Sequence, residues 1–184
     1  MSPNLAALNR AVLRAVTSAP SAAAAWTATV HAVAPSGHIV PPKLQTWDAS
    51  REVAHITAQL AQITEDIPLP PDLTFLYFGL VDLWIPETES EEVGFHLAGG
   101  IADDPEAELA EPRLPYYPDD AFLESALLQE IRLASKALGA DYNVFDYGLM
   151  LGAAGILAKF AARELKLPHA IMVGFDCGDA ARFV

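Results

Sequence analysis

The run LTFLYFGLVDLWIP, from Leu73 to Pro86, constrains the fold of this chain more than any other stretch. Aliphatic and aromatic side chains fall on both faces of an extended backbone here, and β-prone residues dominate the run. Because a strand that is apolar on both faces must be covered on both, we expect a central strand of a sheet. The polar residues ETESEE follow Pro86, and the run from Val93 to Ile101 then offers a hairpin partner.

Helices are expected where apolar residues recur at intervals of three and four. The pattern predicts four of them, over residues 2–17, 48–63, 119–138 and 143–166. The middle of the last helix is apolar on every side, so it should be the buried helix of the fold. Its uncharged run between Asp146 and Lys159 is twelve residues, short of the roughly 20 that a bilayer core requires. We therefore expect no membrane span.

Further strands complete the predicted fold. In AWTATVHAV, apolar and polar residues alternate from Trp26, which predicts a half-exposed strand. HIVPPKLQTW should return beside it as an edge strand, because Pro41-Pro42 cannot donate to a ladder. The C-terminal HAIMVGFDCGDAARFV predicts a closing hairpin that turns at Cys177-Gly178. The expected fold class is α+β: one domain over residues 1–184, with a mainly antiparallel sheet, about four helices and the order α-β-β-α-β-β-α-α-β-β.

The charge of the chain is strongly negative and unevenly placed. The formal net charge is −13, and residues 52–112 contain fourteen Asp and Glu but no Lys or Arg. Nucleic-acid binding requires the opposite sign, because neutralised phosphates supply most non-specific affinity. An acidic surface favours solubility, a cation or a basic protein partner. Direct nucleic-acid binding is therefore not expected.

Sequence motifs for catalysis or cofactor binding are absent. The chain has no GxSxG elbow, HExxH, paired CxxC or phosphate loop, and its five histidines lie at wide intervals. His55 lies one turn from Arg51 and Gln59, and these residues are expected to form the polar, solvent-facing side of their helix together with Glu52 and Gln62. The single cysteine, Cys177, cannot form an internal disulfide, and with Asp176 and Asp179 it is expected to form a turn. We expect no cofactor, no metal site and no catalysis.

Three stretches together prompt a comparison with a known group: LYFGL (76–80), LAGGIADDP with LPYYPDDAFLESALLQEI (97–131), and VGFDCGD (173–179). In this order and spacing they resemble small acidic bacterial proteins that look like immunity proteins of secreted toxin systems. The resemblance implies a cytoplasmic protein that binds and neutralises a cognate toxin without chemistry of its own, and we see no secretory signal. The acidic residues then predicted to contact the toxin are Glu87, Glu89, Glu91, Glu92, Asp103, Asp104, Glu106, Glu108 and Glu111.

Two other classes remain open from the sequence. The first is a small enzyme or ligand-binding module whose pocket lies beside the helix 143–166 and uses Asp146, Tyr147 or the turn at Asp176 and Asp179. The second is a structural or assembly subunit. A ligand that raises the melting temperature would favour the first class, and a large homo-oligomer would favour the second.

Overall fold

The computed structural model describes residues 5–34, 39–86, 89–101, 114–119, 121–139, 144–175 and 180–183. This part of the chain contains six helices and five strands. The helices are α1 (Leu5–Ser18), α2 (Ala22–Val33), α3 (Pro42–Gln45), α4 (Ala49–Asp66), α6 (Ala126–Ala137) and α7 (Val144–Glu164). The strands are β1 (Phe75–Ile85), β2 (Ser90–Gly100), β3 (Phe122–Glu124), β4 (Ala170–Phe175) and β5 (Ala180–Arg182). The predicted α+β class is confirmed.

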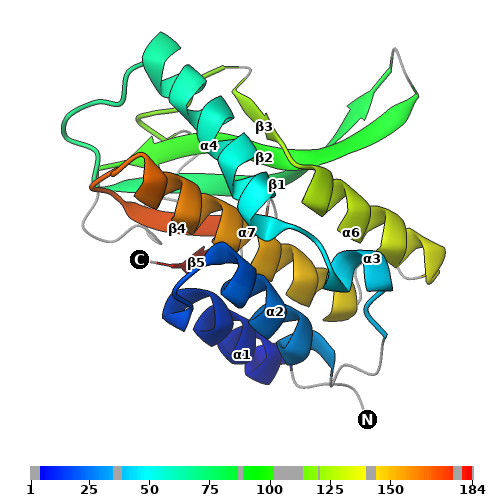
Figure 1. Ribbon diagram of the computed structural model, residues 1–184. Coiled ribbons are helices and arrows are strands. Elements are labelled where there is room, and N and C mark those ends of the chain that lie inside the picture. The colour runs from blue at the N-terminus through cyan, green and yellow to red at the C-terminus, as the bar shows by residue number, and fades with distance from the viewer. Residues whose placement is uncertain are drawn as a thin grey trace.

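The strands form one mixed sheet in the order β3-β2-β1-β4-β5 (Figure 1). The pairings β3–β2, β2–β1 and β4–β5 are antiparallel, whereas β1 and β4 run parallel. Helices α4, α6 and α7 lie along one face of this sheet, and α1 with α2 forms a further layer beyond α7. The sheet is therefore covered by two successive layers of helix on this side.

Strand β1 is central, as its sequence predicts, and lies between β2 and β4. Its first six residues, 75–80, are all buried, because the helices cover one face and a second apolar cluster covers the other. That second cluster contains Phe75, Tyr77, Ala98, Leu114 and Met172. From Val81 onward the residues of β1 alternate between half-buried and exposed. The strand thus leaves the covered part of the sheet halfway along its length.

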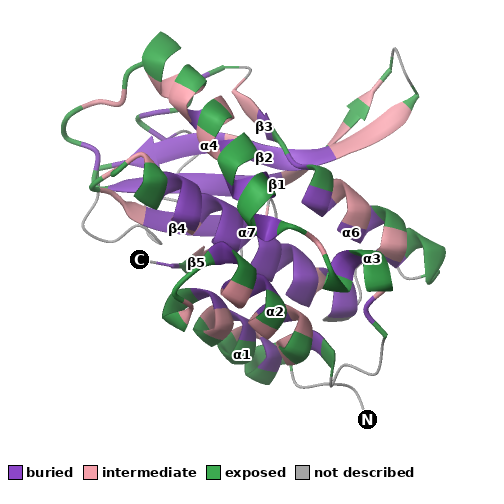
Figure 2. Ribbon diagram, viewed as in Figure 1, coloured by how far each residue is buried: buried purple, intermediate pink, exposed green. Residues whose placement is uncertain are grey.

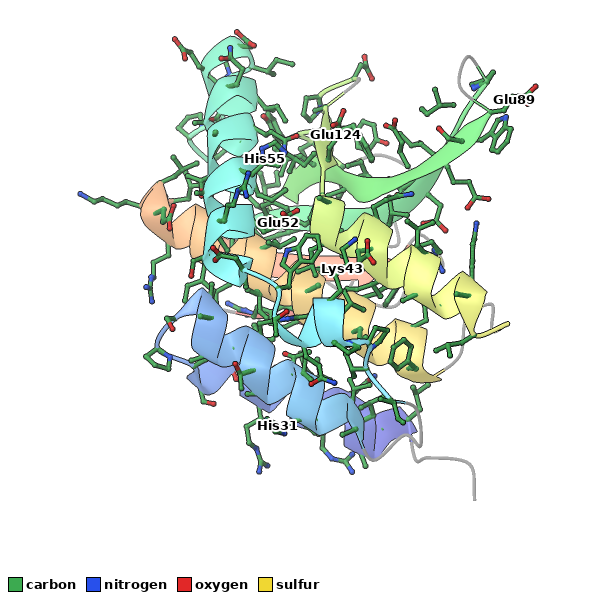
Figure 3. The ribbon with its side chains drawn as sticks, turned by 45° about the vertical axis from the view of Figure 1, so that its right-hand side comes forward. His31, Lys43, Glu52, His55, Glu89 and Glu124 are labelled. Atoms are coloured by element: carbon green, nitrogen blue, oxygen red, sulfur yellow. The ribbon has the colours of Figure 1, made fainter. Side chains whose placement is uncertain are left out.

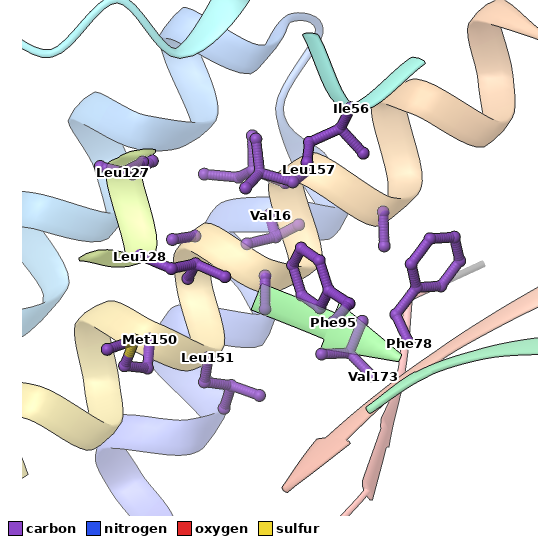
Figure 4. Packing of buried hydrophobic residues seen from close by; sticks show 14 of the residues in the cluster. Val16, Ile56, Phe78, Phe95, Leu127, Leu128, Met150, Leu151, Leu157 and Val173 are labelled. Atoms are coloured by element: carbon purple, nitrogen blue, oxygen red, sulfur yellow. The ribbon is translucent and has the colours of Figure 1, made fainter. Parts of the chain in front are cut away.

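Helix α7 is the buried helix that the sequence predicts. It contacts α1, α2, α4, α6 and β4, and it is buried along nearly its whole length (Figure 2). An apolar window within Phe145–Glu164 is long enough to cross a membrane, but 89% of that window is buried inside the protein. We therefore assign this helix to the core. Figure 4 shows Leu157 of α7 in one cluster with Phe78 and Phe95 of the sheet.

Three glycines of α7 let its neighbours approach. A Cβ built on Gly152 would lie 2.2 Å from Cγ2 of Thr29 in α2, and one on Gly155 would lie 2.4 Å from Cε1 of Phe183. A Cβ on Gly148 would meet Cγ2 of Val33 at 2.9 Å. These glycines therefore allow a close approach to α7, which is made largely by α2.

The predicted strand at AWTATVHAV is wrong, because this segment is helix α2. The side chain of Ser21 caps the helix by accepting a hydrogen bond from the backbone N–H of Ala24 at 3.3 Å. Ala22, Ala25, Trp26, Thr29 and Val33 are buried on one stripe. This spacing is helical, and the run of small alanines lets the stripe pack tightly against α1 and α7. The alternation that predicted a strand was accidental.

Two more element predictions need correction. HIVPPKLQTW does not return as a strand; Pro42 opens the short helix α3 instead, and Pro at a first helical position is favourable. The third predicted helix starts at Ala126, not near Asp119, because Ser125 caps it and residues 122–124 pair with β2 as strand β3. The predicted stop of this helix at Gly139 is confirmed by a φ of 69°. These differences change the predicted element order and helix count.

Candidate functional site

The most distinctive surface of the protein is the outer half of the β1–β2 hairpin, which we call the hairpin arm (residues 81–86 and 89–93). Its outer end extends beyond the other strands of the sheet, as Figure 1 shows. Its register is continuous from Val81↔Gly94 to Ile85↔Ser90. Trp84 is 59% exposed on this arm, although large aromatic side chains usually find cover. The arm therefore offers an aromatic anchor to the solvent.

Helix α6 holds the arm through three polar side chains on one helical face, Gln129, Arg132 and Lys136, which we call the α6 clamp. The N–H of Val93 donates to Oε1 of Gln129 at 3.0 Å, and Nε2 of Gln129 donates to the carbonyl of Glu91 at 2.9 Å. Lys136 forms an ion pair with the side chain of Glu91, and this pair is exposed. The hydrogen bond from Lys136 lowers the pKa of Glu91. The clamp fixes β2 at the base of the arm.

Arg132 lies at the centre of a buried ion-pair network. Its Nη2 donates to Oδ2 of Asp82 at 2.7 Å, and its Nη1 donates to Oδ2 of Asp146 at 2.8 Å. Asp146 is 2% exposed and belongs to the first turn of α7, whereas Asp82 is on the arm. Burial raises the pKa of Asp146, and the guanidinium of Arg132 opposes this shift. One arginine thus joins α6, α7 and the arm.

Two glutamines cover the outer edge of the sheet. Gln129 pairs with the backbone of β2 at Glu91 and Val93, in the manner of a neighbouring strand. Gln59 of α4 does the same for β3: its Nε2 donates to the carbonyl of Glu124 at 2.9 Å and its Oε1 accepts from the N–H of Glu124 at 2.9 Å. Both amides satisfy backbone groups that would otherwise invite another strand.

Glu52 is buried, which corrects the prediction that it belongs to the wet side of its helix. It is 7% exposed, and its Oε1 accepts hydrogen bonds from Oγ of Ser125 at 2.8 Å and from the N–H of Leu127 at 3.1 Å. A carboxylate is favourable here because the N-terminus of a helix carries unpaired N–H groups and a positive dipole. Glu52 therefore joins α4 to the start of α6, as Figure 3 shows.

A groove of about 220 Å³ lies beside this junction. The residues that line it include His55 of α4, Glu92 of β2, Phe122 and Glu124 of β3, and Gln129 of α6. His55 is exposed, as the predicted polar helix face requires, and it points to the same side as Glu124 in Figure 3. The described residues include no group of three His, Cys, Asp or Glu placed to hold a metal ion.

The structure describes only part of the acidic surface that the sequence predicts. Glu89 is exposed at the outer end of the arm, as Figure 3 shows. Glu91 is paired with Lys136, and Glu92 is half-buried and lines the groove. These three residues therefore share the arm. The other predicted contacts, Glu87, Asp103, Asp104, Glu106, Glu108 and Glu111, lie outside the described residues.

The residues suggested for a pocket beside α7 have contacts inside the protein. Asp146 belongs to the ion-pair network, and the ring of Tyr147 stacks on Phe175 with centroids 5.0 Å apart. The hydroxyl of Tyr147 also accepts a hydrogen bond from Nδ2 of Asn9 at 3.1 Å. Asp176, Cys177 and Asp179 lie outside the described residues.

The sequence analysis missed Gln129 and Arg132, and one signal for Arg132 was available. Arg132 follows Leu128 by four residues and precedes Ser135 by three, so it lies on the buried stripe of α6. A charged residue at such a position needs a buried partner. No local signal marks Gln129, because its partners are backbone groups of a strand distant in sequence.

Comparisons of the chain with protein-family models, with curated proteins and with solved structures find no match. The function must therefore be argued from the arm, its clamp and the charge of the chain.

Proposed function

We propose that this chain is an immunity protein, which binds a cognate bacterial toxin in the cytoplasm and neutralises it without catalysis. The observation that carries the proposal is the hairpin arm, which presents Trp84 and the carboxylate of Glu89 to solvent beyond the body of the protein. Tryptophan is enriched among the residues that dominate binding energy at protein interfaces. A projecting arm with an exposed anchor is suited to enter a concave site on a partner.

The charge distribution supports a basic partner. The arm lies within the sequence interval that contains fourteen acidic residues and no Lys or Arg. Toxins that act on nucleic acids or nucleotides carry basic active sites, because their substrates are anionic. An acidic arm would be attracted to such a site and would compete with the substrate.

The proposal is tested by co-expressing the chain with the toxin domain encoded beside it and by measuring growth and association rate. Charge reversal in the variant Glu89→Lys/Glu92→Lys should slow association about tenfold at low salt, because steering depends on local charge. The matched control is Glu65→Lys/Asp66→Lys, which makes the same charge change at the exposed end of α4. Equal effects of the two variants would contradict the arm as the contact surface.

The acidic residues between Ala102 and Arg113 receive a separate test. Reversal of Asp103, Asp104, Glu106 and Glu108 should slow association and flatten its salt dependence. Unchanged protection would remove this segment from the interface and leave the arm alone as the candidate.

A small-ligand module is the second candidate, and the groove at His55 favours it. Glu92, Glu124, His55 and Phe122 are among the residues that line that groove, and this combination of acidic and aromatic residues is suited to a small cationic organic ligand. A thermal-shift screen of polyamines, amino acids and nucleotides tests this function, with His55→Ala and Phe122→Ala as the variants that should abolish any shift.

A further inference from the structure

Within the described part of the chain, one edge of the β-sheet has no partner along the hairpin arm. The last pair between β1 and β4 is Leu80↔Phe175, whereas the pairing of β1 with β2 continues to Ile85↔Ser90. Strand β5 pairs with β4 on the side away from β1, where Ala180 lies opposite Gly174. On the β4 side of the arm, no described residue pairs with β1 beyond Leu80.

The register identifies which backbone groups point toward this edge. In an antiparallel pair, residues alternate between those bonded to the partner strand and those directed away from it. Gln129 bonds to the N–H of Val93 and the C=O of Glu91, so these groups of β2 point away from β1. The backbone N–H and C=O groups of the residues opposite them, Asp82 and Trp84, must then point away from β2. Thr74 is separated from Asp82 by an even number of residues, and its carbonyl accepts a hydrogen bond from the N–H of Ala170 on the β4 side of β1. The alternation is therefore the same at both ends of the strand.

The open edge contrasts with the edge on the other side of the sheet. There, Gln129 and Gln59 each form two hydrogen bonds with outward backbone groups of β2 and β3. Such covering of edges prevents unwanted strand pairing. Amide side chains thus cover one edge, whereas no described residue hydrogen-bonds the backbone N–H and C=O groups of Asp82 and Trp84 on the other.

We propose that the arm binds its partner by strand addition, in which an extended segment of the partner pairs with β1 at Asp82 and Trp84. This inference adds a binding mode to the proposed function. It rests on that function only for the premise that the partner is a protein. Main-chain hydrogen bonds would supply affinity, and side chains on both faces would supply specificity.

The two faces of the arm define the chemistry of that segment. Asp82 and Trp84 lie on the face toward α6, together with Glu91, and Trp84 is exposed. Val81, Leu83 and Ile85 lie on the other face and are half-buried. The partner strand should therefore alternate basic side chains, which contact the carboxylates and the indole face, with aliphatic side chains.

A second copy of this chain fits the edge less well. Pairing of two arms would bring together two acidic segments, and each chain carries a net charge of −13. Like charges placed opposite each other across a sheet are unfavourable. Charge complementarity thus favours a basic segment of another protein.

The test uses the full chain labelled with ¹⁵N and a short capped peptide of alternating lysine and valine. In the unbound protein, the amides of Asp82 and Trp84 should exchange with solvent much faster than those of Val81 and Leu83, which face β2. The peptide should protect both amides and shift their resonances. A peptide of alternating glutamate and valine, and a lysine–valine peptide N-methylated on alternate residues, should do neither.

Two variants separate the backbone from the side chain. Trp84→Ala removes the indole, whereas Trp84→Pro also removes the outward N–H, and proline is tolerated at an open strand edge. The proline variant should bind the lysine–valine peptide about tenfold more weakly than the alanine variant, since one hydrogen bond is lost. Pairing of β1 with β2 should survive in both, as exchange protection at Leu83 would show.

Several outcomes would overturn strand addition. These are equal affinity of the two variants, equal binding of the N-methylated peptide, no saturable shift at millimolar peptide, or shifts confined to the groove at His55. A concentration-dependent dimer of the unbound chain that protects Asp82 and Trp84 would identify a second copy as the occupant and would also contradict the proposal. Loss of toxin protection is a different result, which bears on the proposed function and not on the pairing mode.

Discussion

Replacement of Arg132 by methionine should destabilise this protein more than any other single loss of charge in the α6 clamp. Methionine keeps much of the length and apolar stem of arginine, so the change mainly removes the guanidinium. Two carboxylates then lose the guanidinium: Asp82, which reaches solvent, and Asp146, which is 2% exposed. Asp146 keeps its hydrogen bond with Ser135, but without a cationic partner this buried carboxylate must remain charged at high cost or take up a proton.

The expected loss of unfolding free energy follows from these two possible states of Asp146, charged or protonated. Breaking a buried ion pair costs about 3–5 kcal/mol when one charge is left behind. Protonation of Asp146 sets an upper limit on this loss. Binding a proton costs about 1.4 kcal/mol for each pH unit above the pKa, or roughly 4 kcal/mol near neutral pH for an ordinary aspartate. Burial already raises the pKa of Asp146, which lowers that limit. We expect a loss of about 2–4 kcal/mol near neutral pH.

The loss should depend on pH with a definite sign. Arg132 lowers the pKa of Asp146, so its removal raises that pKa further above the value in the unfolded chain. A carboxyl group whose pKa is raised by folding stabilises the folded state below its unfolded pKa, and this contribution is lost as pH rises through the folded pKa. The difference in unfolding free energy between the variant and the parent protein should therefore decrease as the pH falls, to about 1 kcal/mol near pH 5.

Urea unfolding monitored by circular dichroism, at neutral and at mildly acidic pH, measures the loss of unfolding free energy and its dependence on pH. The double variant Arg132→Met/Asp146→Asn should recover most of the neutral-pH loss, because no buried charge remains. Lys136→Met is the matched control: it breaks an exposed ion pair with Glu91, and the free energy of unfolding should change little because solvent screens such a pair. A loss below about 1 kcal/mol for Arg132→Met at neutral pH, or one that does not vary with pH, would refute the reasoning.

Three further predictions concern neighbouring features. Glu52→Ala should cost about 2–3 kcal/mol of unfolding free energy, because Ser125 and the N–H of Leu127 lose their acceptor. Glu52→Gln should cost about 1 kcal/mol or less, because glutamine retains an oxygen that can accept these hydrogen bonds. Urea unfolding of the two variants measures the difference. Gly152→Ala should destabilise by about 1–3 kcal/mol, since its Cβ would meet Thr29, and Thr29→Ala in the same chain should restore the thermal midpoint. Lys136→Met should speed association with the lysine–valine peptide in stopped-flow measurements, because it leaves Glu91 uncompensated; a slower association would show that the charge of Glu91 does not attract the peptide.

The parts of the fold that could be predicted are those in which burial determines the residue pattern. Strand β1 is apolar on both faces over 75–80, and α7 is apolar on every side, so solvent could not face either element. Helix α2 was mispredicted because the alternation of apolar and polar residues from Trp26 was taken as a strand pattern, whereas the alanines of this segment favour a helix and neighbouring elements cover it. The cover comes from α7, whose glycines admit Thr29 and Val33.

The sequence predicted the β1–β2 hairpin but not the contacts that hold its outer half. The acidic composition around the hairpin predicts a partner surface there, and this stays a prediction. Arg132 joins Asp82, 50 residues away in sequence, to Asp146, 14 residues away. Such long-range pairs leave no periodic pattern. The open edge of β1 was equally hidden, because it depends on where β4 ends relative to β2.

The polar clamp explains how an exposed arm can be presented in a fixed position. A two-stranded hairpin alone is marginally stable in water, and the arm extends beyond the covered part of the sheet. Gln129 fixes its backbone, and Arg132 fixes Asp82 to a carboxylate in the core. Fixing the arm before binding reduces the entropy lost on association, so more of the energy of backbone pairing can appear as affinity. The same contacts hold Asp82 and Trp84 with their outward groups directed away from the rest of the sheet, which is the geometry that strand addition requires.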